Sequence, residues 1–150
     1  MREEMAMLSP QELLVELITR NLDELAHSWL RIVRNHQITR SYGAFDEKVL
    51  HERALKVYEQ LARWIAGEFT KGDIASYYTA LGAQRRREGF PLAEVARALI
   101  VTRRVLWFKV QAEGFLDSPM DAELALLLNN KVVLFFDRAL YFTIYGYERQ

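Results

Sequence analysis

Arginine is the residue type whose position in this sequence of 150 residues is best suited to chemistry. Arg85, Arg86 and Arg87 are consecutive, and Arg97, Arg103 and Arg104 follow closely. Arg97 and Arg104 would share one helix face, from which guanidinium groups could hold an anion through paired hydrogen bonds. A solvated face that pairs with Glu88 and Glu94 explains the same pattern, and we favour it.

Three histidines, His27, His36 and His51, are the other candidates for chemistry. Glu24 and His27 have the Glu-x-x-His spacing of di-iron bundles, which use this motif twice together with two more carboxylates. Here the motif occurs once, so we predict no metal site. A haem ligand or a phosphoacceptor at His27 or His51 remains an alternative, although the residues that normally flank a phosphoacceptor histidine are absent.

Composition excludes several classes of protein. The chain has no cysteine, so thiolate metal sites and disulfides are absent, and 20 basic residues balance 20 acidic ones, which gives no general attraction to nucleic acid. We find no secretory signal and no uncharged apolar run long enough to cross a membrane. No catalytic triad, phosphate loop or carboxylate pair is present. We therefore predict a cytoplasmic protein that is not an enzyme and has no catalytic residue and no cofactor.

Hydrophobic periodicity predicts helices throughout the chain and no strand. The expected fold is a single all-α domain over residues 1–150, a bundle of about five helices with a long C-terminal helix. A loop is expected at residues 36–45. The expected helices cover residues 9–35, 46–66, 70–87, 91–113 and 118–147.

A tight turn is predicted between the third and fourth helices. Gly89 can adopt the positive φ that ends a helix, and Pro91 suits the first position of the next one. We expect Arg86 and Glu94 to pair across this turn and to fix the angle between the two helices. Gly82, isolated inside the third helix, predicts the close approach of a neighbouring helix.

The last helix is apolar around its whole circumference between Val132 and Phe136. A helix of this kind must be buried on every side. We expect one face to pack on the core and the other to meet a second copy of the chain. A central helix wrapped by the others is the alternative. The residues predicted for the dimer interface are Leu128, Val132, Phe135, Phe136 and Tyr145.

The segment from Gly82 to Trp107 also carries a family pattern: a helix with a glycine and an arginine, then Gly-Phe-x-Leu-x-Glu-Val, then a helix with an arginine and a tryptophan. The chain resembles the RsbRD-type N-terminal domain of RsbT co-antagonist proteins and of some bacterial sensor histidine kinases. The matching positions are Gly82, Arg86, Gly89, Phe90, Leu92, Glu94, Val95, Arg103 and Trp107, together with the early Trp29.

This resemblance implies a helical sensory module, globin-like without haem, that regulates a kinase, PAS or STAS output domain in cis or in trans. No such domain follows Gln150, so we expect either a fragment or a partner that binds separately. We expect ligand binding or signal relay at Arg86, Gly89, Glu94, Arg103 and Trp107, through a shift in the packing of the last two helices. A small-molecule or haem carrier and a histidine phosphotransfer protein are the alternatives.

Overall fold

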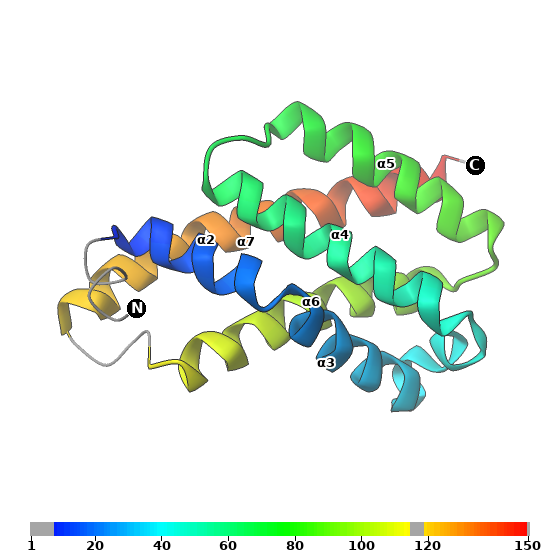
Figure 1. Cartoon of the computed structure of the whole chain (residues 1–150). Helices are drawn as coiled ribbons and strands as arrows, with labels where there is room; N and C mark the ends of the chain where they lie inside the picture. The colour runs from blue at the N-terminus through cyan, green and yellow to red at the C-terminus, as the bar shows by residue number, and fades with distance from the viewer. Residues whose placement is uncertain (1–7, 115–118, 150) are drawn as a thin grey trace.

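The computed structural model describes residues 8–114 and 119–149, and these residues form helices and no strand (Figure 1). The all-α prediction is therefore confirmed. The elements are α2 (Pro10–Arg20), α3 (Leu22–Asn35), the 3₁₀ helix η1 (Gln37–Ala44), α4 (Glu47–Ile65), α5 (Lys71–Arg87), α6 (Leu92–Ala112) and α7 (Pro119–Glu148).

The predicted first helix is two helices, α2 and α3, which meet at Asn21. Its φ of −119° and ψ of 20° leave the helical region. The Asn21 side chain donates a hydrogen bond of 2.7 Å to the carbonyl of Leu17, and its backbone N–H bonds to Ile18. Asparagine competes for backbone carbonyls in this way, which periodicity alone does not reveal. The continuous helix predicted over residues 9–35 is therefore wrong at this position.

The predicted loop at residues 36–45 contains the 3₁₀ helix η1. The imidazole of His36 accepts a hydrogen bond from the backbone N–H of Ile38 and caps this element. The hydroxyl of Thr39 donates to the carbonyl of Val33, which folds η1 back on α3. Tyr42 is thereby buried to 3% exposure, although nothing in its local pattern marks it as a core residue.

The boundaries of α5 and α6 follow the predicted signals closely. Thr70 and Asp73 form a reciprocal capping box at the start of α5. Gly89 adopts a φ of +85°, as predicted for the turn to α6. Pro91 is the N-cap of α6, with a φ of −62° and a ψ of 140°, and not its first helical residue as expected.

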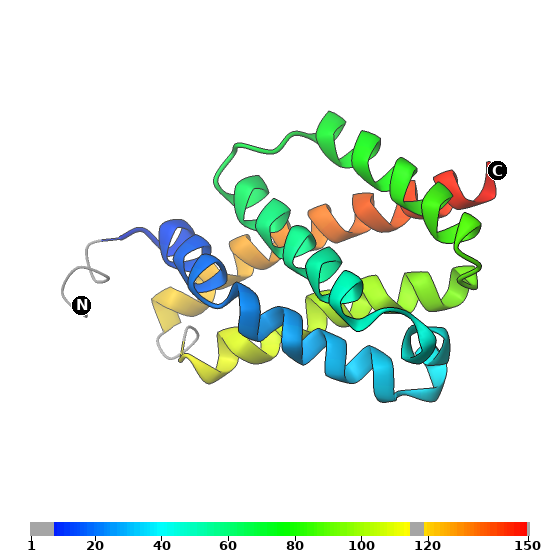
Figure 2. The ribbon, with the colours of Figure 1, turned by 45° about the vertical axis from the view of Figure 1, so that its right-hand side comes forward.

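Helices α5 and α7 lie side by side in both views of the ribbon, where α7 runs behind α4 (Figures 1 and 2). Two glycines allow this approach. A Cβ atom on Gly82 would lie 1.9 Å from the carbonyl oxygen of Thr143, and one on Gly146 would lie 1.9 Å from that of Thr79. The predicted close approach at Gly82 is confirmed, and the neighbouring helix is α7.

Helix α7 buries one face inside the chain's own core. Four of the five residues predicted for a dimer interface lie on this face, namely Leu128, Val132, Phe135 and Phe136, each at most 7% exposed. The interface prediction is therefore misplaced for these four, because contacts with the same chain already cover them. Tyr145 is 38% exposed. No helix in the described part of the chain is long and apolar enough to span a membrane.

Candidate ligand-binding cavity

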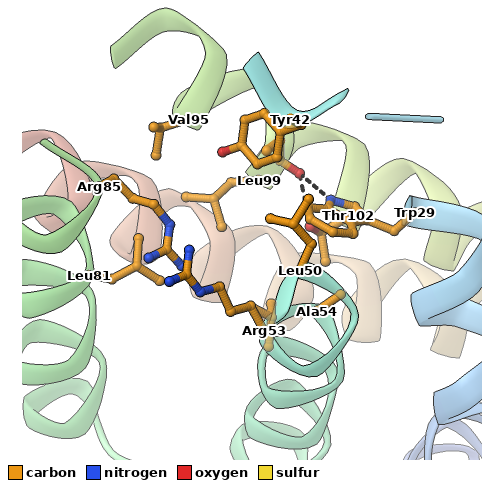
Figure 3. Close-up of a pocket in the computed structure, with 12 residues that line it drawn as sticks. Trp29, Tyr42, Leu50, Arg53, Ala54, Leu81, Arg85, Val95, Leu99 and Thr102 are labelled. Atoms are coloured by element: carbon orange, nitrogen blue, oxygen red, sulfur yellow. Dashed lines mark hydrogen bonds between the residues drawn. The ribbon is translucent and has the colours of Figure 1, made fainter. Parts of the chain in front are cut away.

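A small cavity, with about 40 Å³ of room for water-sized molecules and part of it open to solvent, lies between α3, η1, α4, α5 and α6 (Figure 3). Its walls are mainly apolar, and four polar side chains border it. The lining residues are Trp29, Tyr42, Leu50, Arg53, Ala54, Val57, Leu81, Arg85, Val95, Ala98, Leu99 and Thr102.

Two arginines reach the same end of the cavity from different helices (Figure 3). Arg53 of α4 makes a two-pronged ion pair with Glu88, in which its Nη1 lies 2.9 Å from Oε1. Arg85 of α5 contacts the same Oε1 atom at 3.3 Å. Burial, followed by repulsion from Arg53, lowers the pKa of Arg85, because both oppose its positive charge. The carboxylate of Glu88 thus forms ion pairs with the guanidinium groups of both Arg53 and Arg85.

The opposite wall is aromatic and held by backbone hydrogen bonds. The indole of Trp29 donates to the carbonyl of Ala98 at 2.9 Å, and the hydroxyl of Thr102 donates to the same oxygen. The ring of Tyr42 packs on that of Phe90 at 4.6 Å between centroids. Burial raises the pKa of Tyr42, whereas the nearby charge of Arg85 lowers it, and the net change is upward. Tyr42 therefore stays neutral and can donate a hydrogen bond.

Two residues predicted as site residues, Arg86 and Gly89, lie at the turn between α5 and α6, outside the cavity lining. Arg86 donates to the carbonyl of Tyr147 at 3.0 Å and lies over its ring. The hydroxyl of Tyr147 in turn donates to the carbonyl of Phe90 at 2.7 Å. These contacts join the turn to the C-terminal end of α7.

The predicted ion pair between Arg86 and Glu94 is wrong. Glu94 instead accepts hydrogen bonds from the backbone N–H of Ser41 at 2.8 Å and from its hydroxyl at 2.9 Å. Arg86 bonds to Tyr147. The physical reason is that η1 packs against the start of α6, so its polar groups reach Glu94. Glu94 thus positions η1, the element that carries Tyr42.

Arg103 and Trp107 do not border the cavity. Arg103 lines a separate groove between α6 and α7, with Leu99, Phe136 and Asp137 among its neighbours. Trp107 is partly buried and packs on the core. The structure therefore brings Arg86 and Gly89 together, through the hydrogen bond from the Gly89 N–H to the Arg86 carbonyl, and it places Glu94, Arg103 and Trp107 in other contacts. Sequence reasoning missed Arg53 and Tyr42 as site residues, and it treated Arg85 only as part of the basic group.

Two of the three histidines, His27 and His51, meet at another place, between α3 and α4. His51 Nε2 lies 3.1 Å from Asp23 Oδ1 and 3.2 Å from His27 Nδ1. Three ligand atoms within 4.8 Å of one another could hold a metal ion. Hydrogen bonds among the three side chains account for the same arrangement, and Asp23 is 77% exposed. Glu24, the expected neighbour of His27, pairs with Lys109 instead.

These features define a class of protein: a small helical domain with a small, mainly apolar cavity beside a turn that is bonded to its last helix. The family model of the RsbT co-antagonist protein rsbRD N-terminal domain matches residues 23–150. The chain belongs to this family of signalling domains, as the resemblance predicted. Searches of curated proteins and of solved structures found no match.

Proposed function

We propose that this domain is a sensory and dimerisation module, without catalytic activity, which regulates a histidine kinase or a stressosome-type output in the cytoplasm. A change at the cavity would alter the packing of α5 and α6 and reach the end of α7, where an output domain is attached or docked. The contact of Tyr147 with the turn between α5 and α6 carries this proposal, because it links the cavity wall to the C-terminal end of the chain.

The path from cavity to α7 has three contacts. Tyr42 borders the cavity and stacks on Phe90, which is 2% exposed. The carbonyl of Phe90 accepts the hydrogen bond from Tyr147, and Arg86 holds Tyr147 from the other side. A small displacement of a packed side chain is passed on as a discrete shift because interiors are close-packed. The path supports a relay through the turn and not through Arg103.

We expect Tyr147→Phe to lower the free energy of unfolding by about 1 kcal/mol and to speed hydrogen exchange at the amides of Gly89 and Phe90, because the carbonyl of Phe90 loses its donor. Tyr145→Phe is the matched control, since no described residue pairs with the Tyr145 hydroxyl, and it should change neither quantity. Denaturant titration and amide exchange measure both effects. Equal results for the two variants would contradict the proposed link.

The same pair tests function when the chain is fused through α7 to a histidine kinase domain. Tyr147→Phe should change the basal autophosphorylation rate several-fold, because the end of α7 is no longer held by the turn. Tyr145→Phe should leave the rate unaltered. A Tyr147→Phe fusion with the wild-type rate would remove this path from the mechanism.

An exposed apolar stripe on α7 supports dimerisation. Leu127, Leu134 and Tyr141 are spaced seven residues apart, so they lie on one helix face, and they are 61%, 48% and 60% exposed. Tyr145, four residues after Tyr141, extends the stripe, and the two rings stack. A repeat of seven is the spacing with which two helices pack along each other, and it favours a second copy of α7 as the partner. The inward face of α7 is already covered by the core.

We expect Leu134→Asp to convert a dimer into a monomer, because it places a charge in the centre of the stripe and weakens association by about 100-fold or more. Ile38→Asp is the matched control, since Ile38 is 52% exposed on η1, away from α7. Light scattering at micromolar concentration measures the mass. A wild-type mass of one chain would end the dimer proposal.

A further inference from the structure

The cluster of Asp23, His27 and His51 brings three metal-binding side chains together from two helices. Asp23 and His27 are four residues apart on α3, which places them on one helix face, and His51 comes from α4. One ligand atom from each side chain lies within 4.8 Å of the other two. The sequence predicts no metal site because the Glu24–His27 motif occurs once, but His51 joins His27 only through the packing of α4 on α3.

The distances between these ligand atoms are close to those around a tetrahedral zinc ion. His51 Nε2 lies 3.1 Å from Asp23 Oδ1 and 3.2 Å from His27 Nδ1. His27 Nδ1 lies 3.4 Å from Asp23 Oδ2. Zinc binds nitrogen and oxygen ligands at about 2.0–2.1 Å, so two ligands at the tetrahedral angle are about 3.3–3.4 Å apart. Small rotations of the side chains would therefore let all three contact one ion.

Hydrogen bonds are the alternative account of the cluster, but they do not satisfy every short contact. His51 Nε2 needs a proton to donate to Asp23 Oδ1, and His27 Nδ1 needs one to donate to the Asp23 carbonyl at 2.9 Å. The contact between the two nitrogens, however, needs a proton on only one of them. An ion between the two nitrogens removes this conflict, because both lone pairs then point at it. The bound state gives up only the contact with the Asp23 carbonyl.

The ligand types and their surroundings favour Zn²⁺ among the common ions. Two imidazoles and one carboxylate suit zinc, whereas Mg²⁺ and Ca²⁺ prefer oxygen ligands. The side chain of His51 is 19% exposed, whereas those of His27 and Asp23 are 64% and 77% exposed, so water can reach the remaining coordination position. Asp23 forms ion pairs with the two histidines, and no lysine or arginine in the described ranges pairs with its carboxylate.

We propose that Asp23, His27 and His51 bind one Zn²⁺ ion, whose coordination is completed by water. The ion joins the beginning of α3 to α4 and holds the two helices together. This inference goes beyond the proposed sensory function, because zinc binding depends neither on dimerisation nor on the relay through Tyr147. The tests of those two features can therefore fail while the zinc test succeeds, and the reverse is equally possible.

Calorimetric titration of the untagged whole chain with zinc chloride tests the proposal, and magnesium chloride provides the control ion. We expect saturable binding of one Zn²⁺ per chain. The affinity for Mg²⁺ should be weaker by about 100-fold or more, because Mg²⁺ prefers oxygen ligands and gives up its water reluctantly. Saturating zinc should also raise the melting temperature, because the ion binds the folded arrangement of α3 and α4 and not the unfolded chain.

Three variants locate the ligands. Asp23→Asn keeps the shape of the side chain but removes its charge, and His27→Gln and His51→Gln each remove a ring nitrogen. Each should weaken zinc binding by more than about tenfold, since the loss of a group that only orients a ligand already costs about 10- to 100-fold. Glu52→Gln and His36→Gln are the matched controls and should bind zinc as the wild type does. Glu52 is an exposed carboxylate next to His51, and His36 is an exposed histidine at the start of η1.

Each outcome decides the proposal, provided that every titration is made below the melting temperature of the variant. Zinc binding by the wild type and by both controls, which the three ligand variants lose while they remain folded, supports the site. No saturable zinc binding by the wild type overturns it and indicates a cluster held by hydrogen bonds. Binding that the three ligand variants retain, or that His36→Gln weakens equally, places the ion elsewhere and also overturns it. Equal affinity for Zn²⁺ and Mg²⁺ overturns the assignment of imidazole ligands.

Discussion

Gly82→Ala is expected to lower the free energy of unfolding by about 3 kcal/mol, one of the largest effects of any single methyl group in this chain. The new Cβ would lie 1.9 Å from the carbonyl oxygen of Thr143 and 2.8 Å from the backbone nitrogen of Tyr147. Both neighbours are backbone atoms and cannot turn aside as a side chain could. Helices α5 and α7 would have to separate. This loss exceeds the gain in helix propensity of about 1 kcal/mol.

Gly72→Ala provides the control within the same helix. Its Cβ would meet only the Thr70 hydroxyl, at 3.7 Å, which is ordinary contact. We expect Gly72→Ala to leave stability unchanged or to raise it by about 0.5 kcal/mol. Gly146→Ala should repeat the Gly82 effect, because its Cβ would meet the carbonyl of Thr79 at 1.9 Å. Denaturant titration of the three variants measures the differences. Similar stability for Gly82→Ala and Gly72→Ala would contradict the close helix crossing.

Most of the fold could be predicted because it is specified by local signals. Caps at Ser9 and Thr70, the glycines after α4 and α5, and the apolar periodicity place the helix ends within a few residues. The isolated Gly82 indicated a close contact but could not name the partner helix. The break at Asn21 was missed because the apolar stripe continues across it, and only the hydrogen bonds to Leu17 and Ile18 reveal it.

The candidate site depends on contacts between residues distant in sequence, which local patterns do not contain. Ser41 and Glu94 are 53 positions apart, and Arg53 and Glu88 are 35 apart. Among three consecutive arginines, the rotation of α5 decides that Arg85 faces the cavity, whereas Arg86 contacts Tyr147 and both Arg86 and Arg87 are exposed. The basic group was visible in the sequence, but which of its members is buried follows from packing alone.

The apolar circumference of α7 illustrates the same limit. The composition of α7 indicates more apolar surface than one buried face requires. It does not indicate which of its faces packs on the core. Packing against α5 and its neighbours covers Phe135 and leaves Leu134 at 48% exposure. The sequence of a helix shows its period, whereas its rotation is fixed by contacts with other helices, such as that between Gly82 of α5 and Thr143 of α7. Dimerisation stays a prediction, and the exposed stripe on α7 replaces the four buried residues as its predicted interface.

Glu88→Gln tests how much the carboxylate shared by Arg53 and Arg85 contributes to the free energy of unfolding. Arg85→Met removes a buried cation but leaves no charge unpaired, because Glu88 keeps its ion pair with Arg53. Arg85→Met should therefore change the free energy of unfolding by less than about 1 kcal/mol. Glu88→Gln instead leaves two guanidinium groups without their shared carboxylate. We expect it to cost about 2–3 kcal/mol, less than for a fully buried pair because Glu88 retains 19% side-chain exposure.

The control is Glu113→Gln, which breaks the pair with Lys109 at a side chain that is 50% exposed and should cost less than about 1 kcal/mol. Denaturant titration of the two variants measures the difference, because Glu88 pairs with two buried or half-buried arginines whereas Glu113 pairs with one lysine near the surface. Equal losses for Glu88→Gln and Glu113→Gln would contradict the role of Glu88 as the shared counterion of Arg53 and Arg85.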